Sequence, residues 1–344
     1  MTMTAEAALE LVRRPDGMTA AEVEEVFAAL TSGAWEAAAG GRVLASWSAR
    51  GETAVELAAL VRLLRSMAIT VDSPPSCDVC GTGGSGLTRF NISTTSAFIL
   101  AAAGIPVAKH GNLGSRRPNG SFDLLAELDI PFDLPPAALV RLQAETGVCF
   151  LFARKHHPQV GKVVPYRKAA GGRTIFNLAG PLANPAPLAV QVIGVADPAL
   201  AEVVIGALQE LQVARALVVN GDPGIDEWSV VGATRWWSLD HGCIDSGTAP
   251  GAAAATLAYE ELPGGDAPEN AAIFRRLLAG EEIGPLLDML CANAGLAIDL
   301  WHGRSPQPDG AGSKLARQLL ASGVVATTVD RHRSLAKELQ LLRS

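Results

Sequence analysis

A glycine-rich stretch, residues 81–86, is the first feature whose residue types suit chemistry. A short, partly β-branched run at 77–80 precedes it, and a small apolar run at 95–103 follows it. A strand, a glycine turn and a helix in this order direct free backbone N–H groups at an anion. Ser93 and Thr94 stand where they can cap the helix and face a ligand. The stretch predicts an anion site, with a plain turn of the chain as the alternative.

Basic side chains follow the next predicted strand. Lys109, His110 and Asn112 come directly after an apolar run, where ligand sites of α/β proteins collect. A lysine suits a phosphate as a point charge. Arg116 and Arg117 come soon after and indicate either a clamp for a polyanion or a solvated surface.

Histidines and arginines follow a further apolar run at 148–152. His156 and His157 are adjacent, and no other ligand lies at zinc-like spacing, so a wet pocket is favoured over a metal site. Arg167 and Arg173 flank a predicted short helix. Either arginine can grip a carboxylate through two hydrogen bonds.

Two adjacent carboxylates, Asp226 and Glu227, follow the apolar run at 216–219 and a glycine-containing turn. Such a pair in a loop suits Mg²⁺, which also keeps waters and substrate phosphates as ligands. An exposed acidic turn is the alternative, and the neighbouring Trp228 either covers a pocket or packs. Together with the anion loop and the basic residues, the pair indicates a Mg²⁺-dependent enzyme acting on a phosphorylated substrate.

The composition is that of a globular protein. The 344 residues are 49% hydrophobic and 18% charged, enough for one large domain or two smaller ones with a real core. The net charge of −7 disfavours nucleic-acid binding by the whole surface. The sequence has neither a long apolar run nor a signal pattern at its start, so we expect a cytoplasmic protein without a membrane span.

Five cysteines are an odd number for a disulfide framework. Cys77 and Cys80 form a C-x-x-C pattern, but residues three apart on a strand point to opposite faces of a sheet. Core packing is therefore favoured over zinc or redox chemistry.

The order of predicted elements divides the chain in two. Residues 1–72 show helical patterns without strand signals, including capping boxes that begin at Thr19 and Thr53. A linker rich in Pro and Ser follows at 73–76. From 77 to 344, short apolar runs alternate with helices, which predicts βαβ units and a mainly parallel sheet in an α/β fold.

Further elements complete the prediction. Beyond 77–80, strands are expected at 105–108, 148–152, 190–195 and 216–219. A hairpin is expected at 230–236, a polar loop at 177–184, and a long helix at 285–301 with two more helices after it.

The motifs resemble, from about residue 18 to 336, those of the anthranilate phosphoribosyltransferases. They are Arg50-Gly51-Glu52-Thr53, Gly81-Thr82-Gly83-Gly84, Asn91-Ile92-Ser93-Thr94, Lys109-His110-Gly111-Asn112, His156-His157-Pro158, Arg173-Thr174-Ile175-Phe176-Asn177-Leu178, Gly180-Pro181-Leu182, Asn184-Pro185 and Asp226-Glu227. The resemblance implies a phosphoribosyltransferase-like fold with a small helical domain hinged to a larger α/β domain. It also implies that helices near 158–185 pack on the helical domain, and that a homodimer forms through it.

The resemblance implies transfer of the phosphoribosyl group from 5-phosphoribosyl 1-pyrophosphate (PRPP) to anthranilate, in tryptophan biosynthesis. The implied PRPP-binding residues are Gly81, Gly83, Gly84, Ser85, Asn91, Ser93, Thr94, Lys109, Arg117 and Ser121. The implied anthranilate-binding residues are Gly81, His110, Asn112, His157 and Arg167. Two Mg²⁺ ions are implied, one on Ser93 and Glu227 and one on Asp226 and Glu227. No side-chain base is evident, so positioning should dominate catalysis.

The chain departs from the family pattern at several positions. Ser85 replaces an acidic residue, and Arg89 replaces a threonine. Residues 113–117, with Arg116 and Arg117, replace an arginine followed by small and hydroxyl residues, and Pro118 replaces a lysine. Two alternatives follow: a related transferase with another aromatic acceptor, and a non-catalytic binding protein. In the second, Arg89, Arg116 and Arg117 would offer a patch to nucleic acid, which the acidic total disfavours.

Overall fold

Five parallel strands and an antiparallel hairpin make up the sheet of this computed structural model, which describes residues 3–114, 118–251, 258–281 and 284–342. The strands are β1 (Ser76–Gly81), β2 (Val107–Gly111), β3 (Val148–Phe152), β4 (Leu188–Gly194), β5 (Arg215–Gly221), β6 (Thr234–Asp240) and β7 (Cys243–Ala249). Their order is β3-β2-β1-β4-β5-β6-β7. The predicted α/β fold with a mainly parallel sheet is confirmed.

The strand order reverses between β1 and β4. The chain goes outward from β1 to β2 and β3 on one side, and from β4 to β5 on the other. In open α/β sheets, ligands bind outside the carboxyl ends of the strands at such a reversal. Here those ends are Gly81 and Gly194.

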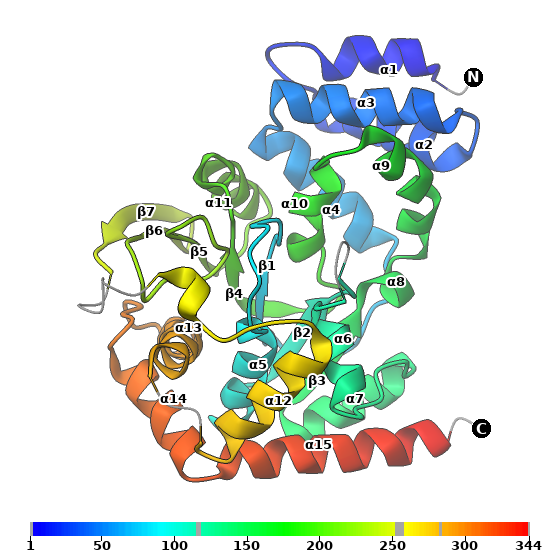
Figure 1. Ribbon diagram of the computed structural model, residues 1–344. Coiled ribbons are helices and arrows are strands. Elements are labelled where there is room, and N and C mark those ends of the chain that lie inside the picture. Colours follow the sequence, from blue (N-terminus) through cyan, green and yellow to red (C-terminus); the bar gives the residue numbers. More distant parts are fainter. Residues whose placement is uncertain (1–2, 115–117, 252–257, 282–283, 343–344) are drawn as a thin grey trace.

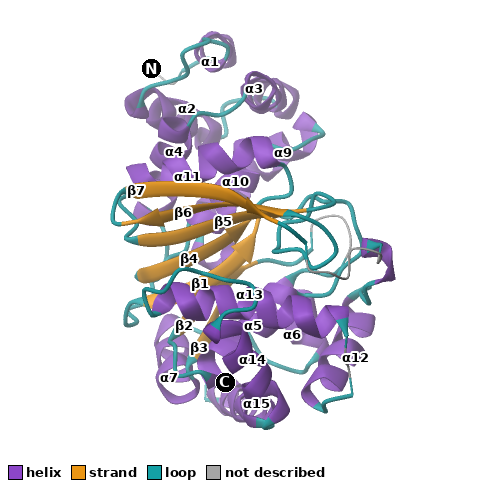
Figure 2. Cartoon of the chain, turned by 90° about the vertical axis from the view of Figure 1, so that its left-hand side faces the viewer, coloured by secondary structure: helices purple, strands orange, loops and turns teal. Residues whose placement is uncertain are grey.

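The parallel strands β1–β5 are covered by helices on both faces of the sheet (Figure 2). Successive residues of β4 point to different cores: Val192 packs in one, and Ile193 in the other. This period of two, in a strand without polar alternation, is typical of a parallel sheet covered by helices on both sides. Cys77 and Cys80 also pack on opposite sides of β1, so the expected core role of the C-x-x-C pattern is confirmed.

Helices of one layer lie beyond the sheet at the N-terminal end of the chain (Figure 1). They are α1 (Ala5–Val12), α2 (Ala20–Ser32), α3 (Ala37–Arg50) and α4 (Ala54–Ser66). The capping boxes at Thr19 and Thr53 are both formed, as predicted. The layer gives the small helical domain; its bounds at 1–72, and those of the α/β domain at 77–344, stay a prediction.

The remaining helices cover the two faces of the sheet. They are α5 (Ile92–Ala102), α6 (Ser121–Glu127), α7 (Pro136–Thr146), α8 (Ala153–His156), α9 (Val164–Ala170), α10 (Ile175–Leu182), α11 (Ala201–Glu210), α12 (Ala267–Leu278), α13 (Pro285–Trp301), α14 (Ala311–Ala321) and α15 (Val324–Leu341), with short 3-10 turns at Pro158–Val163, Pro198–Leu200 and Tyr259–Glu261. In Figure 2, α4, α10 and α11 lie on one side of the sheet and α5, α13 and α14 on the other. No helix among the described residues is long and apolar enough to cross a membrane.

Helix α9 packs directly on α3. A Cβ atom added at Gly40 would lie 2.4 Å from Cδ1 of Tyr166, so only glycine lets the ring come this close. The Tyr166 hydroxyl donates a hydrogen bond to the Trp35 carbonyl at 3.1 Å. Two of the helices between 158 and 185 thus contact the N-terminal layer, α9 on α3 and α10 on α4.

Several local predictions are wrong. The hairpin begins at Thr234, not at residue 230, because the Ser229 hydroxyl accepts the N–H groups of Val231 and Gly232 and holds them in a loop. Ser93 and Thr94 are not the cap of α5 but lie in its first turn.

Two further predictions fail between residues 164 and 184. Arg167 lies within α9 rather than beside it. The expected polar loop forms most of α10, because the Asn177 side-chain oxygen accepts the N–H of Thr174 at 3.0 Å and closes the start of that helix. The sequence prediction also omits α12, a helix whose apolar positions are interrupted by charged residues.

Candidate active site

The glycine stretch after β1 is fixed by Asp226. The N–H of Gly83 donates a hydrogen bond to Asp226 Oδ2 at 2.8 Å. A Cβ atom added at Gly81 would lie 2.2 Å from that same oxygen, so the close approach of the carboxylate requires glycine there. The predicted anion loop and the predicted acidic pair therefore meet at the strand-order reversal.

The Asp226 carboxylate also forms an ion pair with Arg89, through Oδ1 and Nη1. The two side chains are 5% and 21% exposed, so the pair is largely removed from solvent. The backbone of Arg89 is held by α12, because Asn270 Nδ2 donates to its carbonyl at 3.0 Å. Sequence analysis noted Arg89 as a departure from the family pattern and as part of a basic patch, and it missed this role, because nothing in the local sequence links Arg89 to Asp226.

A small cavity lies where β1, β4, α5 and α13 meet, and it is lined by Ser93, Asp226, Glu227 and Asn293, among others. Asn293 of α13 fixes the acidic loop through hydrogen bonds with both the N–H and the carbonyl of Trp228 at 2.9 Å. Trp228 itself is buried in the core, so it packs rather than covering a pocket. Sequence analysis did not identify Asn293, because a single Asn within an apolar helix carries no distinctive signal.

Glu227 carries the clearest open bonding position of the site. Its Oε2 atom is buried and has no hydrogen-bond partner among the residues that the structure describes. Burial raises the pKa of its carboxyl, and Arg89 opposes that shift. Among the described residues, no group of three or more His, Cys, Asp or Glu side chains is arranged so that it could hold a metal ion by itself. The donors present, two carboxylates and the Ser93 hydroxyl, fit a hard ion that takes its other ligands from water and phosphate, as Mg²⁺ does.

Lys109 lies within β2, not after the strand as the sequence predicted. Its side chain is buried, and Nζ donates to the Val79 carbonyl at 2.7 Å. Burial lowers the pKa of Lys109, and Asp78 on the neighbouring strand opposes this. Burial also raises the pKa of Asp78 to about 6. Asp78 in turn accepts hydrogen bonds from Asn184 Nδ2 at 2.8 Å and from the N–H of His110 at 3.3 Å.

His110 and His157 lie edge to face, with ring centroids 5.2 Å apart. His110 Nδ1 lies 3.0 Å from the Gly180 carbonyl, which assigns the proton to this nitrogen. Burial lowers the pKa of both imidazoles, so both are neutral at pH 7. The neighbouring residue His156 instead forms a hydrogen bond through Nδ1 with the Ile69 carbonyl, at 2.5 Å.

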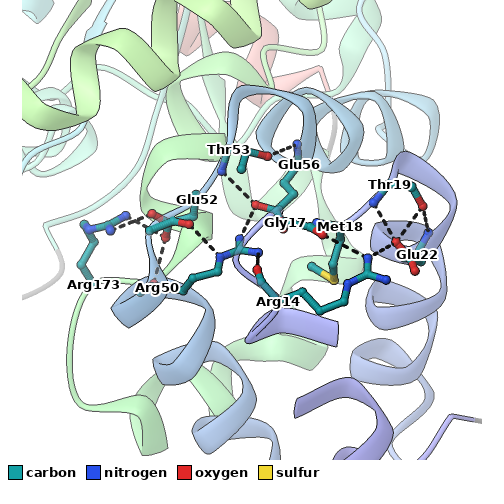
Figure 3. A network of polar contacts seen from close by, with 12 residues as sticks. Arg14, Gly17, Met18, Thr19, Glu22, Arg50, Glu52, Thr53, Glu56 and Arg173 are labelled. Carbon is teal, nitrogen blue, oxygen red and sulfur yellow. Dashed lines mark hydrogen bonds and ion pairs between the residues drawn. The ribbon is translucent and has the colours of Figure 1, made fainter. Parts of the chain in front are cut away.

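The structure gives Arg167 and Arg173, which the sequence did not distinguish, different partners. Arg173 Nη1 and Nη2 donate to the two oxygens of Glu52 at 2.9 and 2.8 Å, as Figure 3 shows. Arg167 forms no ion pair with a carboxylate of the described chain. It lies over the Phe176 ring, 5.8 Å from its centroid, and reaches Asn177 at 3.5 Å. Arg167 is therefore the one of the two that is available to a carboxylate.

Other predicted site residues lie around the same strand ends. Asn91 Nδ2 donates to the Asn119 carbonyl at 2.8 Å. Ser121 begins α6 beside Gly111, the last residue of β2. Asn112 is exposed, and Ser85 Oγ accepts the N–H of Leu87 at 3.3 Å.

Arg116 and Arg117 lie outside the residues that the structure describes, whereas Thr94 lies within them. The Thr94 hydroxyl is buried in α5, without a hydrogen-bond partner among the described residues.

Comparison with known proteins identifies the family. Residues 73–326 match the model described as the glycosyl transferase family, a/b domain. The anthranilate phosphoribosyltransferase of Novosphingobium aromaticivorans is 40% identical over 291 residues, which cover 82% of this chain and 88% of that protein. Its counterpart in Roseiflexus castenholzii is 38% identical over 335 residues, which cover 94% and 95%.

Solved structures agree with the sequence relatives. The crystal structure of anthranilate phosphoribosyltransferase from Thermus thermophilus superposes with a TM-score of 0.85 at 36% identity, covering 96% of this chain and 99% of that one. The Saccharomyces cerevisiae enzyme in complex with PRPP and Mg has a TM-score of 0.84 at 21% identity, covering 98% and 100%, which shows the same fold. This chain belongs to the anthranilate phosphoribosyltransferase family.

Proposed function

We propose that the protein transfers the 5-phosphoribosyl group of PRPP to the amine of anthranilate, giving N-(5-phosphoribosyl)anthranilate and pyrophosphate, in tryptophan biosynthesis. One observation carries the proposal. Ser93, Asp226 and Glu227, from two distant segments, line a single cavity beside the glycine stretch, and a buried Glu227 oxygen there has no partner among the described residues. Such a site matches a phosphorylated donor bound with a hard cation.

The donor half of the reaction needs stabilisation of negative charge. Breaking the bond between the anomeric carbon and pyrophosphate leaves positive charge on the ribose and negative charge on the leaving group. Backbone N–H groups of the glycine stretch stabilise that negative charge from fixed positions, apart from those of Thr82 and Gly83, which are hydrogen-bonded within the chain. Mg²⁺, held by Ser93 and Glu227, would supply further neutralisation of the phosphate oxygens. Lys109 donates a hydrogen bond to the Val79 carbonyl in β1, the strand that leads into the glycine stretch.

The acceptor half needs orientation rather than proton transfer. An aromatic amine is unprotonated at pH 7, so its lone pair is ready to attack the anomeric carbon. Arg167 binds the anthranilate carboxylate, and the neutral rings of His110 and His157 contact the aromatic ring. Holding the amine against the anomeric carbon supplies the main rate enhancement.

A dimer through the N-terminal helices is part of the same proposal. Large apolar side chains remain exposed on this layer and next to it, namely Val55, Met67, Ile69 and Val164. Burying them between two chains would remove apolar surface from water. Light scattering coupled to gel filtration should give twice the chain mass, and a monomer at micromolar concentration would contradict this part.

The reaction is tested by following the loss of anthranilate fluorescence with PRPP. We expect turnover with Mg²⁺ and its loss when EDTA removes the ion. A panel of aminobenzoates, followed by pyrophosphate release, serves as the control for the acceptor, and a carboxylate ortho to the amine should be preferred. Folded protein that releases no pyrophosphate with any of these acceptors would refute the proposal.

A further inference from the structure

Asp226 and Glu227 are neighbours in the sequence but differ in what binds them. Asp226 is bound by the chain itself: Oδ2 accepts the N–H of Gly83 at 2.8 Å, and Oδ1 forms an ion pair with Arg89, although it has no hydrogen-bond partner among the described residues. Glu227 Oε2 is buried without a hydrogen-bond partner in the described part of the chain. Only one of the two carboxylates is thus left open to a cation.

We propose that the Arg89 guanidinium is a resident cation of the site, so that the protein binds a single divalent ion per active site, at Ser93 and Glu227. This inference rests on the proposed function, and it replaces the second of the two ions that the family resemblance implies. Arg89 takes the place on Asp226 that this second ion would need.

Electrostatics favour the resident arginine. The positively charged guanidinium neutralises the Asp226 carboxylate without a bound metal ion. Its burial leaves little screening by salt. A divalent ion placed on Asp226 would have to displace the guanidinium and would then lie close to a like charge. An ion on Glu227 would not have to displace the guanidinium, since Glu227 Oε2 has no hydrogen-bond partner among the described residues.

The backbone at Arg89 is fixed by its neighbours, so the ion pair with Asp226 is not a chance contact of a surface side chain. Asn270 of α12 donates through Nδ2 both to the Arg89 carbonyl and to Asn91 Oδ1, at 3.0 and 2.8 Å. Gly264 packs on the same peptide: an added Cβ there would lie 2.5 Å from the Arg89 carbonyl carbon. The backbone thus holds Arg89 where its side chain reaches Asp226.

Native mass spectrometry with PRPP and Mn²⁺ tests the inference, because it counts the ions on each protein chain that carries PRPP. We expect one Mn²⁺ per PRPP-bound chain in the wild type and in Arg89→Lys, which keeps a positive charge. Arg89→Ala should bind two. Arg89→Met, which keeps the length of the stem, serves as a second charge-free variant should the alanine variant fold poorly. Glu227→Gln, in the wild-type background, should bind none.

Two outcomes would overturn the inference. Two Mn²⁺ ions on the wild type would mean that Arg89 is displaced, and a single ion on both charge-free variants would mean that it excludes nothing. Turnover of anthranilate by the same samples separates these failures from a failure of the proposed function. Absence of any bound PRPP, together with absence of turnover, would overturn both.

Discussion

Two charged regions of this protein differ in how completely their buried carboxylates are hydrogen-bonded by the chain. Among the N-terminal helices, the buried Glu56 accepts the N–H of Met18 at 2.9 Å and that of Thr53 at 2.8 Å, and pairs with Arg50 (Figure 3). At the strand ends, Glu227 keeps a buried oxygen without a partner among the described residues. A carboxylate whose bonding positions are filled by the chain holds the fold together, whereas one left incomplete is available to a ligand.

Removing Glu56 should give the largest effect. Glu56→Ala leaves the mostly buried Arg50 and two N–H groups without their partner, so we expect the free energy of unfolding to fall by about 3–5 kcal/mol. Urea denaturation followed by circular dichroism measures this. The matched control is Glu22→Ala, which removes the corresponding, more exposed carboxylate of the other capping box and should cost much less. Equal losses in the two variants would contradict the comparison.

Glu227→Gln should show the reverse pattern. Because burial raises the pKa of this carboxyl, its charge disfavours the fold at pH 7, and a neutral amide should leave the melting temperature unchanged or higher. Loss of charge stabilisation at the leaving group should lower kcat/KM by roughly 10²–10³-fold. Thermal melting and the fluorescence assay on one sample measure both. A lower melting temperature with full activity would place Glu227 among the structural carboxylates.

The two arginines provide a smaller test of the same contrast. Arg167→Ala removes a charged hydrogen-bonding partner of the acceptor, worth about 1.5–3 kcal/mol, so kcat/KM for anthranilate should fall about 10- to 150-fold. The KM for PRPP should change little. Arg173→Ala is the control, since it breaks the pair with Glu52 and should act mainly on stability. If Arg173→Ala harmed anthranilate use more than Arg167→Ala, the assignment would be reversed.

The smallest effect should be seen in the pH dependence of stability. The hydrogen bond from Arg14, with those from Thr19, lowers the pKa of Glu22 from 4.5 to about 2. A carboxyl whose pKa is lower in the folded state stabilises the fold above its unfolded pKa and loses that contribution as the pH falls toward the folded value. Glu22→Gln should therefore flatten the decline in unfolding free energy between pH 4.5 and 2. Identical slopes would show that the pair contributes nothing.

Patterns confined to a few residues could be predicted from the sequence. The capping box at Thr19 depends only on a residue three positions later, and the strand at Val148–Phe152 on one apolar run. The same applies to α13, whose bounds follow from Pro285 and from the end of its apolar residues. The residue types alone indicated that the glycine stretch suits a phosphate and that the acidic pair suits a metal ion.

Contacts between distant segments could not be predicted in this way. Nothing in the residues around Arg89 indicates that it reaches Asp226, and nothing around Arg173 indicates Glu52, 121 residues away. Which arginine stays available is therefore decided by folding rather than by local sequence. The hairpin was misplaced for a related reason, since the side chain of Ser229 holds the first apolar residues out of the strand.

The close packing of α9 against Gly40 of α3 has a consequence for the chemistry. Arg167, the proposed ligand of the acceptor, lies in a helix that packs on the N-terminal layer, whereas the proposed donor site lies at the strand ends. In the proposed reaction the two substrates are therefore bound by different layers. The position of the amine relative to the anomeric carbon then depends on how these layers pack on each other. A side chain larger than hydrogen at position 40 would displace Tyr166 and alter the reacting distance without touching either substrate.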